Sequence, residues 1–161
     1  MSRALVIGVD PGPTTGIVAL PYAGVGEEAA LGWPMVLQCD HYSVVYFVRA
    51  LLDGHTAYRR MLAVEQFVVG PRSSRSGTAE AGRITRRLIG ALSTIDGGTQ
   101  MVLRPAGQVK PWATDRRLDA AGLLAPTAGM NHARDAARHA LYAAVHSGLA
   151  DDPMSTKAGV R

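Results

Sequence analysis

The sequence predicts an α/β fold in which a five-stranded mixed sheet is flanked by helices and the first three strands form a meander. Two observations predict this fold. Short, almost wholly apolar runs at residues 3–10 and 61–69 are typical of strands buried inside a sheet. Apolar residues recur every three or four positions within residues 78–95 and again after residue 131, as they do along one face of a helix.

Composition narrows the possible partners and the compartment. The chain has 161 residues and a formal net charge of +4, and Lys110 and Lys157 are its only lysines, so arginine supplies most of the positive charge. Arginine binds phosphate well, which favours a nucleic-acid partner. The single cysteine, Cys39, excludes an intrachain disulfide and suits the cytoplasm, and no apolar run approaches the length of a membrane span. We expect one domain at residues 1–148 and a flexible tail at 149–161.

The first two strands are predicted at residues 3–10 and 15–20, joined by a turn that contains Pro11 and Gly12. Asp10 ends the first of them. A carboxylate in this position is costly to bury unless a positive group meets it, so a metal ion or a phosphate-bearing ligand is the first hypothesis. The alternative is an aspartate that closes its own turn.

The next two elements are a third strand at residues 34–42 and a helix at residues 44–52. Val44, Val48 and Leu52 lie on one face of this helix. We expect Ser43 to cap its start and Gly54 to end it in the left-handed conformation.

The fourth strand, residues 61–69, carries Glu65 inside an apolar run. Alternation along a strand places Glu65 and Phe67 on the same face. A buried glutamate is rare unless it has a partner, so Glu65 is the second candidate ligand. The alternative is a salt bridge to an arginine.

The loop after this strand is a candidate DNA contact. Four of its polar residues suit contacts with a phosphate backbone: Arg72, Ser73, Ser74 and Arg75. The alternative is an ordinary solvated loop, which has the same composition. The following helix, residues 78–95, carries Arg83 away from its apolar stripe, where it is a further candidate. A fifth strand is predicted at residues 100–104 and a short helix at 114–124.

The last helix begins near Asn131 and has an apolar stripe made mostly of alanine. His132 and Asp135 are three residues apart at the rim of this stripe, close to the helix start, where the helix dipole favours anionic groups. Both are candidate ligands. The alternatives are a neutral, hydrogen-bonded histidine and an ordinary first-turn charge, and His139 is assigned to packing.

Together these motifs resemble the ribonuclease H-like superfamily, and within it the RuvC-like Holliday junction resolvases, in particular their compact phage-type members. The resemblance covers residues 4–147. Asp10-Pro-Gly, with the threonines that follow, corresponds to the first motif of that family, and Glu65-Gln to the second. Gln108-Val-Lys110 corresponds to a segment before the last helix, and His132-Ala-Arg-Asp135 to the final motif.

This resemblance implies a homodimeric crossover junction endodeoxyribonuclease of the cytoplasm, or of the host cytoplasm if it is phage-encoded, that cleaves branched DNA with two Mg²⁺ ions. Mn²⁺ is expected to substitute, because imidazole suits it better. Asp10 would bridge both ions, Glu65 would bind one ion, and Asp135 would bind one or both. His132 would serve the second ion as ligand or proton shuttle. Lys110 would contact the scissile phosphate, unless it is an ordinary surface lysine.

The sequence departs from the family pattern at the DNA contacts. The usual glycine-, alanine- and lysine-rich segment is replaced around Trp112, so Arg116 and Arg117 are the candidates for its basic contacts. Phe67 is the candidate for the aromatic that stacks on a displaced base, although it stands one position early and suits the core equally well. Forks and flaps therefore remain possible substrates. Two other functions also remain open: an actin-like or kinase-like ATP-binding domain, and a branched-DNA-binding module that does not cleave.

Overall fold

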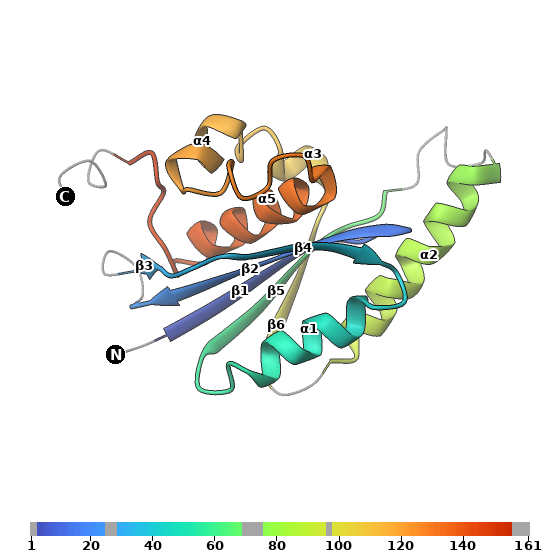
Figure 1. Ribbon diagram of the computed structural model, residues 1–161, viewed down its shortest axis with the longest axis horizontal. Coiled ribbons are helices and arrows are strands. Elements are labelled where there is room, and N and C mark those ends of the chain that lie inside the picture. The colour runs from blue at the N-terminus through green and yellow to red at the C-terminus, as the bar shows by residue number, and fades with distance from the viewer. Residues whose placement is uncertain (1–2, 25–28, 69–75, 96–97, 156–161) are drawn as a thin grey trace.

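The computed structural model describes residues 3–24, 29–68, 76–95 and 98–155, which form a mixed sheet with helices on both faces (Figure 1). One face is covered by α5 with the short helices α3 and α4, and the opposite face by α1 and α2. This arrangement confirms the predicted α/β class. The helices are α1 (Val44–Asp53), α2 (Ser76–Ser93), α3 (Ala106–Val109), α4 (Asp115–Ala120) and α5 (Asn131–His146).

The sheet runs in the order β3-β2-β1-β5-β6, and β4 also pairs with β2. β2 is antiparallel to β1, β3 and β4, so the first part of the sheet is the predicted meander. β1, β5 and β6 are parallel to one another. The strands are β1 (Arg3–Asp10), β2 (Thr14–Ala23), β3 (Ala30–Leu31), β4 (Met35–Asp40), β5 (Arg59–Glu65) and β6 (Thr99–Arg104).

The described sheet has six strands instead of the predicted five, because the structure adds β3 at residues 30–31, whereas β4 corresponds to the predicted third strand at residues 34–42. β3 pairs with the end of β2, and β4 pairs with residues 14–19 along the same edge. Between them, the N–H of Gly32 donates to the carbonyl of Pro21, and Pro34 has no N–H to continue the ladder. Residues 30–31, for which the sequence predicts no strand, therefore belong to the sheet.

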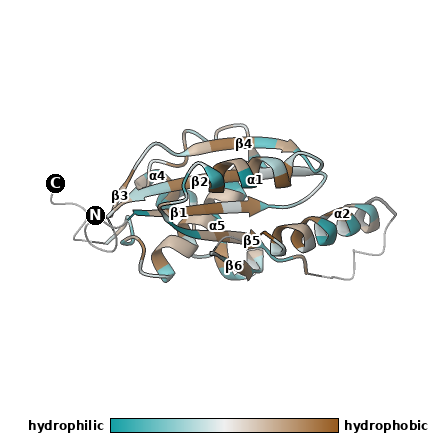
Figure 2. Ribbon diagram, turned by 90° about the horizontal axis from the view of Figure 1, so that it is seen from below, coloured by the Kyte–Doolittle hydropathy of each residue, from teal (hydrophilic) through white to brown (hydrophobic). Residues whose placement is uncertain are grey.

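Alternation along β1 and β5 divides the core into two layers. Ala4, Val6, Met61 and Ala63 face the alanines of α5. Their neighbours Leu5, Ile7, Leu62 and Val64 face α1 and α2. Hydrophobic residues accordingly fill the strands, whereas α2 alternates between hydrophobic and hydrophilic residues around its turns (Figure 2). The same alternation turns the last residue of each strand, Asp10 and Glu65, toward the α5 side.

α5 lies unusually close to the sheet because two glycines face it. A Cβ atom at Gly8 would lie 2.0 Å from the carbonyl oxygen of Ala136, and one at Gly16 would lie 2.0 Å from that of His132. No side chain fits at such distances. The glycines of β1 and β2 therefore bring the start of α5 directly onto the strand end that carries Asp10.

Several helix boundaries and caps differ from the expectations: α2 spans Ser76–Ser93 instead of 78–95, and α4 ends at Ala120 instead of 124. Gly54 ends α1 in the right-handed conformation, with φ of −68°. Ser43 makes no side-chain cap; Asp40 Oδ1 accepts the Ser43 N–H at 3.1 Å instead. At α5, Asn131 is already the first helical residue, and a side chain from β4 takes the capping role, as described below.

The predicted flexible tail, residues 149–161, begins before the folded domain ends. Leu149 and Ala150 are buried in the core beside α5, and Arg117 holds Asp152 through two hydrogen bonds of 3.0 and 3.1 Å. Residues 149–155 therefore pack with the domain, because they supply apolar contacts and a charge partner. In the ranges that the structure describes, no helix has the length and apolar character needed to cross a membrane.

Candidate functional site

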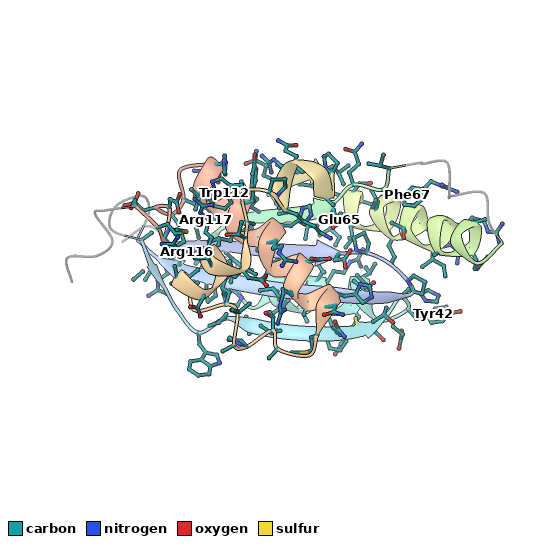
Figure 3. All side chains as sticks on the ribbon, turned by 90° about the horizontal axis from the view of Figure 1, so that it is seen from above. Tyr42, Glu65, Phe67, Trp112, Arg116 and Arg117 are labelled. Carbon is teal, nitrogen blue, oxygen red and sulfur yellow. The ribbon has the colours of Figure 1, made fainter. Side chains whose placement is uncertain are left out.

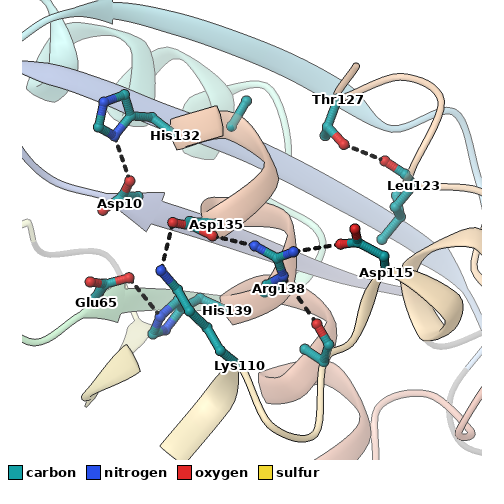
Figure 4. Close-up of polar contacts among 12 residues, drawn as sticks. Asp10, Glu65, Lys110, Asp115, Leu123, Thr127, His132, Asp135, Arg138 and His139 are labelled. Carbon is teal, nitrogen blue, oxygen red and sulfur yellow. Dashed lines mark hydrogen bonds and ion pairs between the residues drawn. The ribbon is translucent and has the colours of Figure 1, made fainter. Parts of the chain in front are cut away.

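The candidate site forms where the carboxyl ends of β1 and β5 meet the start of α5 (Figure 4). Val9 and Val64 are register partners in the parallel pair, so the next residues, Asp10 and Glu65, end adjacent strands. His132 and Asp135 come from the first turns of α5. Four of the predicted site residues, far apart in sequence, thus lie around one end of the sheet.

Asp10 is held by a histidine and by the fold around its turn. Its Oδ2 lies 2.7 Å from Nδ1 of His132. The turn itself is closed by Thr15, whose Oγ1 donates to the carbonyl of Gly12 at 2.9 Å, and is tied to α2 by Thr85, whose hydroxyl donates to the carbonyl of Pro11 at 3.1 Å. Threonines therefore fix the turn, and the Asp10 carboxylate is turned toward α5.

Gln38 positions His132. Its Oε1 accepts the backbone N–H groups of His132 and Ala133 at 2.9 and 3.2 Å, so a side chain from β4 caps the start of α5. An N-cap satisfies backbone donors that the helix leaves without partners. Because Gln38 lies on a strand of the sheet, this cap also ties the helix to the strands that carry Asp10.

The environment of Asp10 raises its pKa from 3.8 to about 6. Burial is the largest cause, and the negative charge of Glu65 is the next. The hydrogen bond to His132 acts in the opposite direction, and Asp135 adds a smaller increase. The carboxylates of Glu65 and Asp135 are therefore close enough to disfavour the charge of Asp10.

Glu65 is paired with a buried histidine and not with an arginine. Its Oε2 lies 3.2 Å from Nε2 of His139, of which 2% is exposed. The two atoms are not aligned as a hydrogen bond, and neither has another hydrogen-bond partner among the described residues. The assignment of His139 to packing was incomplete, because its ring also faces a candidate ligand.

Asp135 is bound by two cationic side chains. Nζ of Lys110 donates to its Oδ2 at 2.7 Å, and Nη1 of Arg138 donates to its Oδ1 at 2.5 Å. Burial lowers the pKa of Lys110, but the hydrogen bond and charge of Asp135 outweigh it, so that the pKa is raised overall. Lys110 therefore lies against Asp135 in the candidate site.

The side chains fit a divalent cation by their chemistry. Across the described ranges, no three His, Cys, Asp or Glu side chains are arranged as a metal-binding group, and each of the three acids contacts a cation or a histidine. Carboxylate oxygens are nevertheless the donors that Mg²⁺ prefers. The buried Oε2 of Glu65 lacks an aligned donor, and Asp10 has a raised pKa, so a positive ion would relieve both.

A cleft of about 460 Å³ opens beside Glu65. Phe67 and Pro105 line it, together with Pro11 and Thr85. Strand β5 ends at Glu65, so the expected alternation stops there and Phe67 turns to the other side of the sheet. Its ring would collide with a Cβ at position 82 of α2, and the Arg86 guanidinium lies 5.3 Å from the ring centroid.

The predicted DNA contacts differ in how accessible their side chains are. Arg116 is exposed, whereas Arg117 is engaged within the protein: it stacks on Trp112 at 4.2 Å and binds Asp152. In Figure 3, Arg116, Arg117 and Trp112 lie together, and Glu65 lies between this group and Phe67. Arg83 is exposed on α2 and pairs with Glu80. The predicted loop contacts lie outside the described residues: Arg72, Ser73, Ser74 and Arg75.

Sequence reasoning missed Gln38 and Arg138 entirely. Arg138 stands three residues after Asp135, a spacing that places two side chains together on a helix and is the signal that could have found it. Gln38 gives no comparable signal, because it lies 94 residues from His132 and meets it only through the fold.

Comparisons with known proteins identify the fold. RuvC from T. thermophilus in complex with a Holliday junction substrate matches with a TM-score of 0.58 and 19% sequence identity, covering 89% of this chain and 95% of that chain. A second Thermus thermophilus RuvC structure matches with a TM-score of 0.55 and 21% identity, with the same coverage. No protein-family model and no curated protein sequence matches. The chain therefore has the RuvC-like form of the ribonuclease H-like fold, as predicted.

Proposed function

We propose that the protein is a metal-dependent, structure-selective endonuclease that resolves Holliday junctions and related branched DNA. The observation that carries this proposal is the meeting of Asp10, Glu65 and Asp135 at one end of the sheet, where burial and the neighbouring carboxylates raise the pKa of Asp10. The fold is shared with a RuvC structure that holds a Holliday junction substrate, which supports a four-way junction as the preferred substrate.

Asp10, Glu65, Asp135 and His132 would hold two Mg²⁺ ions, and Mn²⁺ would substitute because His132 offers an imidazole nitrogen. When bound, such ions supply a hydroxide nucleophile and stabilise the leaving oxygen of the phosphodiester. Asp10 is the proposed shared ligand, because its pKa responds to both Glu65 and Asp135.

Two side chains of the site have proposed roles apart from ligation. His132 is half exposed and contacts Asp10 through Nδ1, so it can carry a proton between the site and solvent. Lys110 has 42% of its side chain exposed and stays protonated, so its ammonium can bind the scissile phosphate.

The cleft beside Glu65 is the proposed entry for the DNA strand. Its volume of about 460 Å³ lies within the range of small-ligand pockets and suits one nucleotide. Phe67, on its wall, is the proposed stacking residue for a displaced base. Arg116 is the proposed phosphate contact on the other side of the site. We further propose a homodimer, because cutting two opposed strands of a junction requires two sites related by symmetry.

The test is a cleavage panel of four-way, forked, flap and linear DNA with Mg²⁺ or Mn²⁺, in which the positions of the nicks are mapped. We expect paired nicks in the four-way junction and little cleavage of linear duplex. Asp135→Asn should abolish nicking yet retain junction binding in Ca²⁺, because it removes a ligand and leaves the DNA surface intact. Asp119→Asn, an exposed aspartate of α4, is the matched control.

Undiminished nicking by Asp135→Asn would exclude the role of this carboxylate in catalysis. Two other outcomes would favour the other functions. Junction binding without cleavage by the wild-type protein in either metal would favour a binding module, and ATP hydrolysis without DNA cleavage would favour a kinase-like domain.

A further inference from the structure

Tyr42 is an exposed aromatic residue in the turn between β4 and α1, and 82% of it is open to solvent. Single exposed aromatics are common on protein surfaces and by themselves indicate nothing. Three further features of Tyr42 point to a ligand: its place relative to the candidate site, the support of its ring, and the basic residues nearby.

The position of Tyr42 is fixed relative to the candidate site by the sheet. Asp10 pairs with Gly16 of β2, which in turn pairs with Gln38 of β4. Gln38 also caps the start of α5, so β4 is tied to both halves of the site. β4 ends two residues before Tyr42, which therefore lies just beyond the end of the sheet that carries Asp10. In Figure 3, Tyr42 and Phe67 lie toward the same end of the molecule.

The ring of Tyr42 is supported by its neighbours. The ring centroids of His41 and Tyr42 are 3.9 Å apart, and the ring planes are tilted by 36°. Oδ1 of Asp40 accepts the backbone N–H groups of Tyr42 and Ser43 at 2.9 and 3.1 Å, which fixes the turn. A partially ordered ring loses less freedom when a flat ligand stacks on it. Tyr42 is therefore better prepared for stacking than a freely rotating surface side chain.

Basic side chains of α2 lie near this turn. The pKa of Glu80 is lowered chiefly by its hydrogen bond to Arg83, with smaller contributions from Arg87 and His41. Glu80 thus lies within electrostatic reach of both arginines and of His41. Arg83 and Arg87 are exposed, and a guanidinium binds phosphate well. An aromatic ring beside cationic side chains is the combination by which proteins hold an unpaired base and its phosphates.

The surroundings of the ring suit a nucleobase better than a protein surface. Its neighbours along the chain, Asp40, His41 and Ser43, are polar. Continuous exposed apolar patches are the usual mark of a protein–protein site. The next exposed aromatic along the chain, Tyr46, packs edge-on against Phe47. Tyr42 therefore offers one ring in polar surroundings, which is enough for one base.

We propose that Tyr42 is a stacking residue for an unpaired nucleobase near the branch point, and that this base differs from the one assigned to Phe67. This inference rests on the proposed function. Every base has a π-face, so stacking does not depend on the sequence. A base inside a duplex is already stacked on its neighbours, so the contact favours DNA with unpaired bases. Tyr42 would thus contribute to structure selectivity without a sequence preference.

The test is a binding series in Ca²⁺ with four-way junctions that each carry one abasic nucleotide at a different position near the crossover. An abasic nucleotide keeps the phosphate and removes the base. We expect the wild-type protein to lose affinity about fivefold or more at the position whose base stacks on Tyr42. Tyr42→Ala should bind the intact junction that much more weakly and lose nothing further at this position. Tyr42→Phe should behave like wild type, because it keeps the ring.

Two variants control the experiment. Trp33→Ala removes an aromatic residue that is 88% exposed beyond the opposite end of β4, so it should keep the wild-type profile. Phe67→Ala should abolish the loss at a different abasic position, because Phe67 is assigned to another base.

Three results would count against the inference. Folded Tyr42→Ala with the same abasic profile as wild type would overturn it. Loss of junction affinity together with a changed oligomeric state in light scattering would also overturn it, because a second copy of the chain would then cover this ring. Wild-type protein that binds a four-way junction no more tightly than linear duplex would overturn the proposed function, and this inference with it.

Discussion

Nε2 of His139 lies 3.2 Å from Oε2 of Glu65 in the interior of the protein, and Glu65 is the carboxylate that ends β5. We expect this contact to restrict the orientation of the Glu65 carboxylate, as groups behind a metal ligand do. The contact makes His139 a supporting residue of the candidate site, in addition to its place in the core.

His139→Leu keeps the side-chain volume approximately but removes the ring nitrogen. We expect the Mg²⁺ concentration that gives the half-maximal rise in melting temperature to increase by about 10-fold or more, the usual effect of losing a support of this kind. His139→Gln should restore part of the affinity. His146→Gln, an exposed histidine of the same helix, should change nothing. A midpoint equal to that of wild type in folded His139→Leu would contradict this role.

Asp10→Asn should make the metal-free protein more stable at neutral pH. The carboxyl has a pKa of about 6 in the folded protein and 3.8 as its ordinary value, so the folded state binds the proton more tightly. Protonated Asp10 therefore adds to the free energy of unfolding. This contribution is fully present below about pH 4 and is lost as the pH rises through about 6, which lowers the free energy of unfolding by roughly 3 kcal/mol. Urea unfolding in EDTA at pH 4 and pH 7 measures it.

The asparagine variant should lose most of this pH dependence, and Mg²⁺ should stabilise wild type but not the variant. Asp119→Asn should keep the wild-type profile, because Asp119 is exposed on α4. If Asp10→Asn unfolded with the same pH dependence as wild type, the raised pKa of Asp10 would be excluded as the cause of that dependence.

Gly16→Ala should destabilise the protein severely. The added Cβ would lie 2.0 Å from the His132 carbonyl oxygen and 2.4 Å from the Ala133 nitrogen, and these are backbone atoms that cannot turn away. We expect a loss of about 3 kcal/mol or more in the free energy of unfolding. Gly90→Ala, on α2 with nothing within 4 Å of the added atom, should instead gain about 0.5–1 kcal/mol. Equal stability of the two variants would show that α5 can move off the sheet.

Arg116 and Arg117, neighbours in sequence, should respond in opposite ways to alanine substitution. Arg117→Ala loses two hydrogen bonds to Asp152 and the stacking on Trp112, so stability should fall by about 1–3 kcal/mol while junction affinity in Ca²⁺ is retained. Arg116→Ala should weaken junction binding and lower its salt dependence by about one ion, without loss of stability. The reverse pattern would place Arg117 on the DNA.

The sequence predicted the elements of the fold well because their signals are local. Apolar runs and helical periodicity define β1, β5, α2 and α5, and the acid at the end of each strand stands out against its apolar surroundings. Strand β3 was missed because its two residues carry no strand signal of their own, and only the pairing with β2 shows that the chain stays at the sheet edge.

The partners of the acids could not be predicted in the same way. Each carboxylate was identified, but each is faced by a cation or histidine from a distant part of the chain: His132 for Asp10, His139 for Glu65 and Lys110 for Asp135. The contact between Arg117 and Asp152 could not be predicted either, because the two residues are far apart in sequence and meet only in the folded protein.

The glycines at positions 8 and 16 have a mechanical consequence. Because α5 touches the backbone of β1 and β2 with no side chain between, Asp10 and His132 sit on what is in effect a single rigid body. Induced fit in this half of the site would require the sheet itself to deform. We therefore expect adaptation to an incoming ligand to come from Lys110, which directly follows the short helix α3 and has a long, partly exposed side chain.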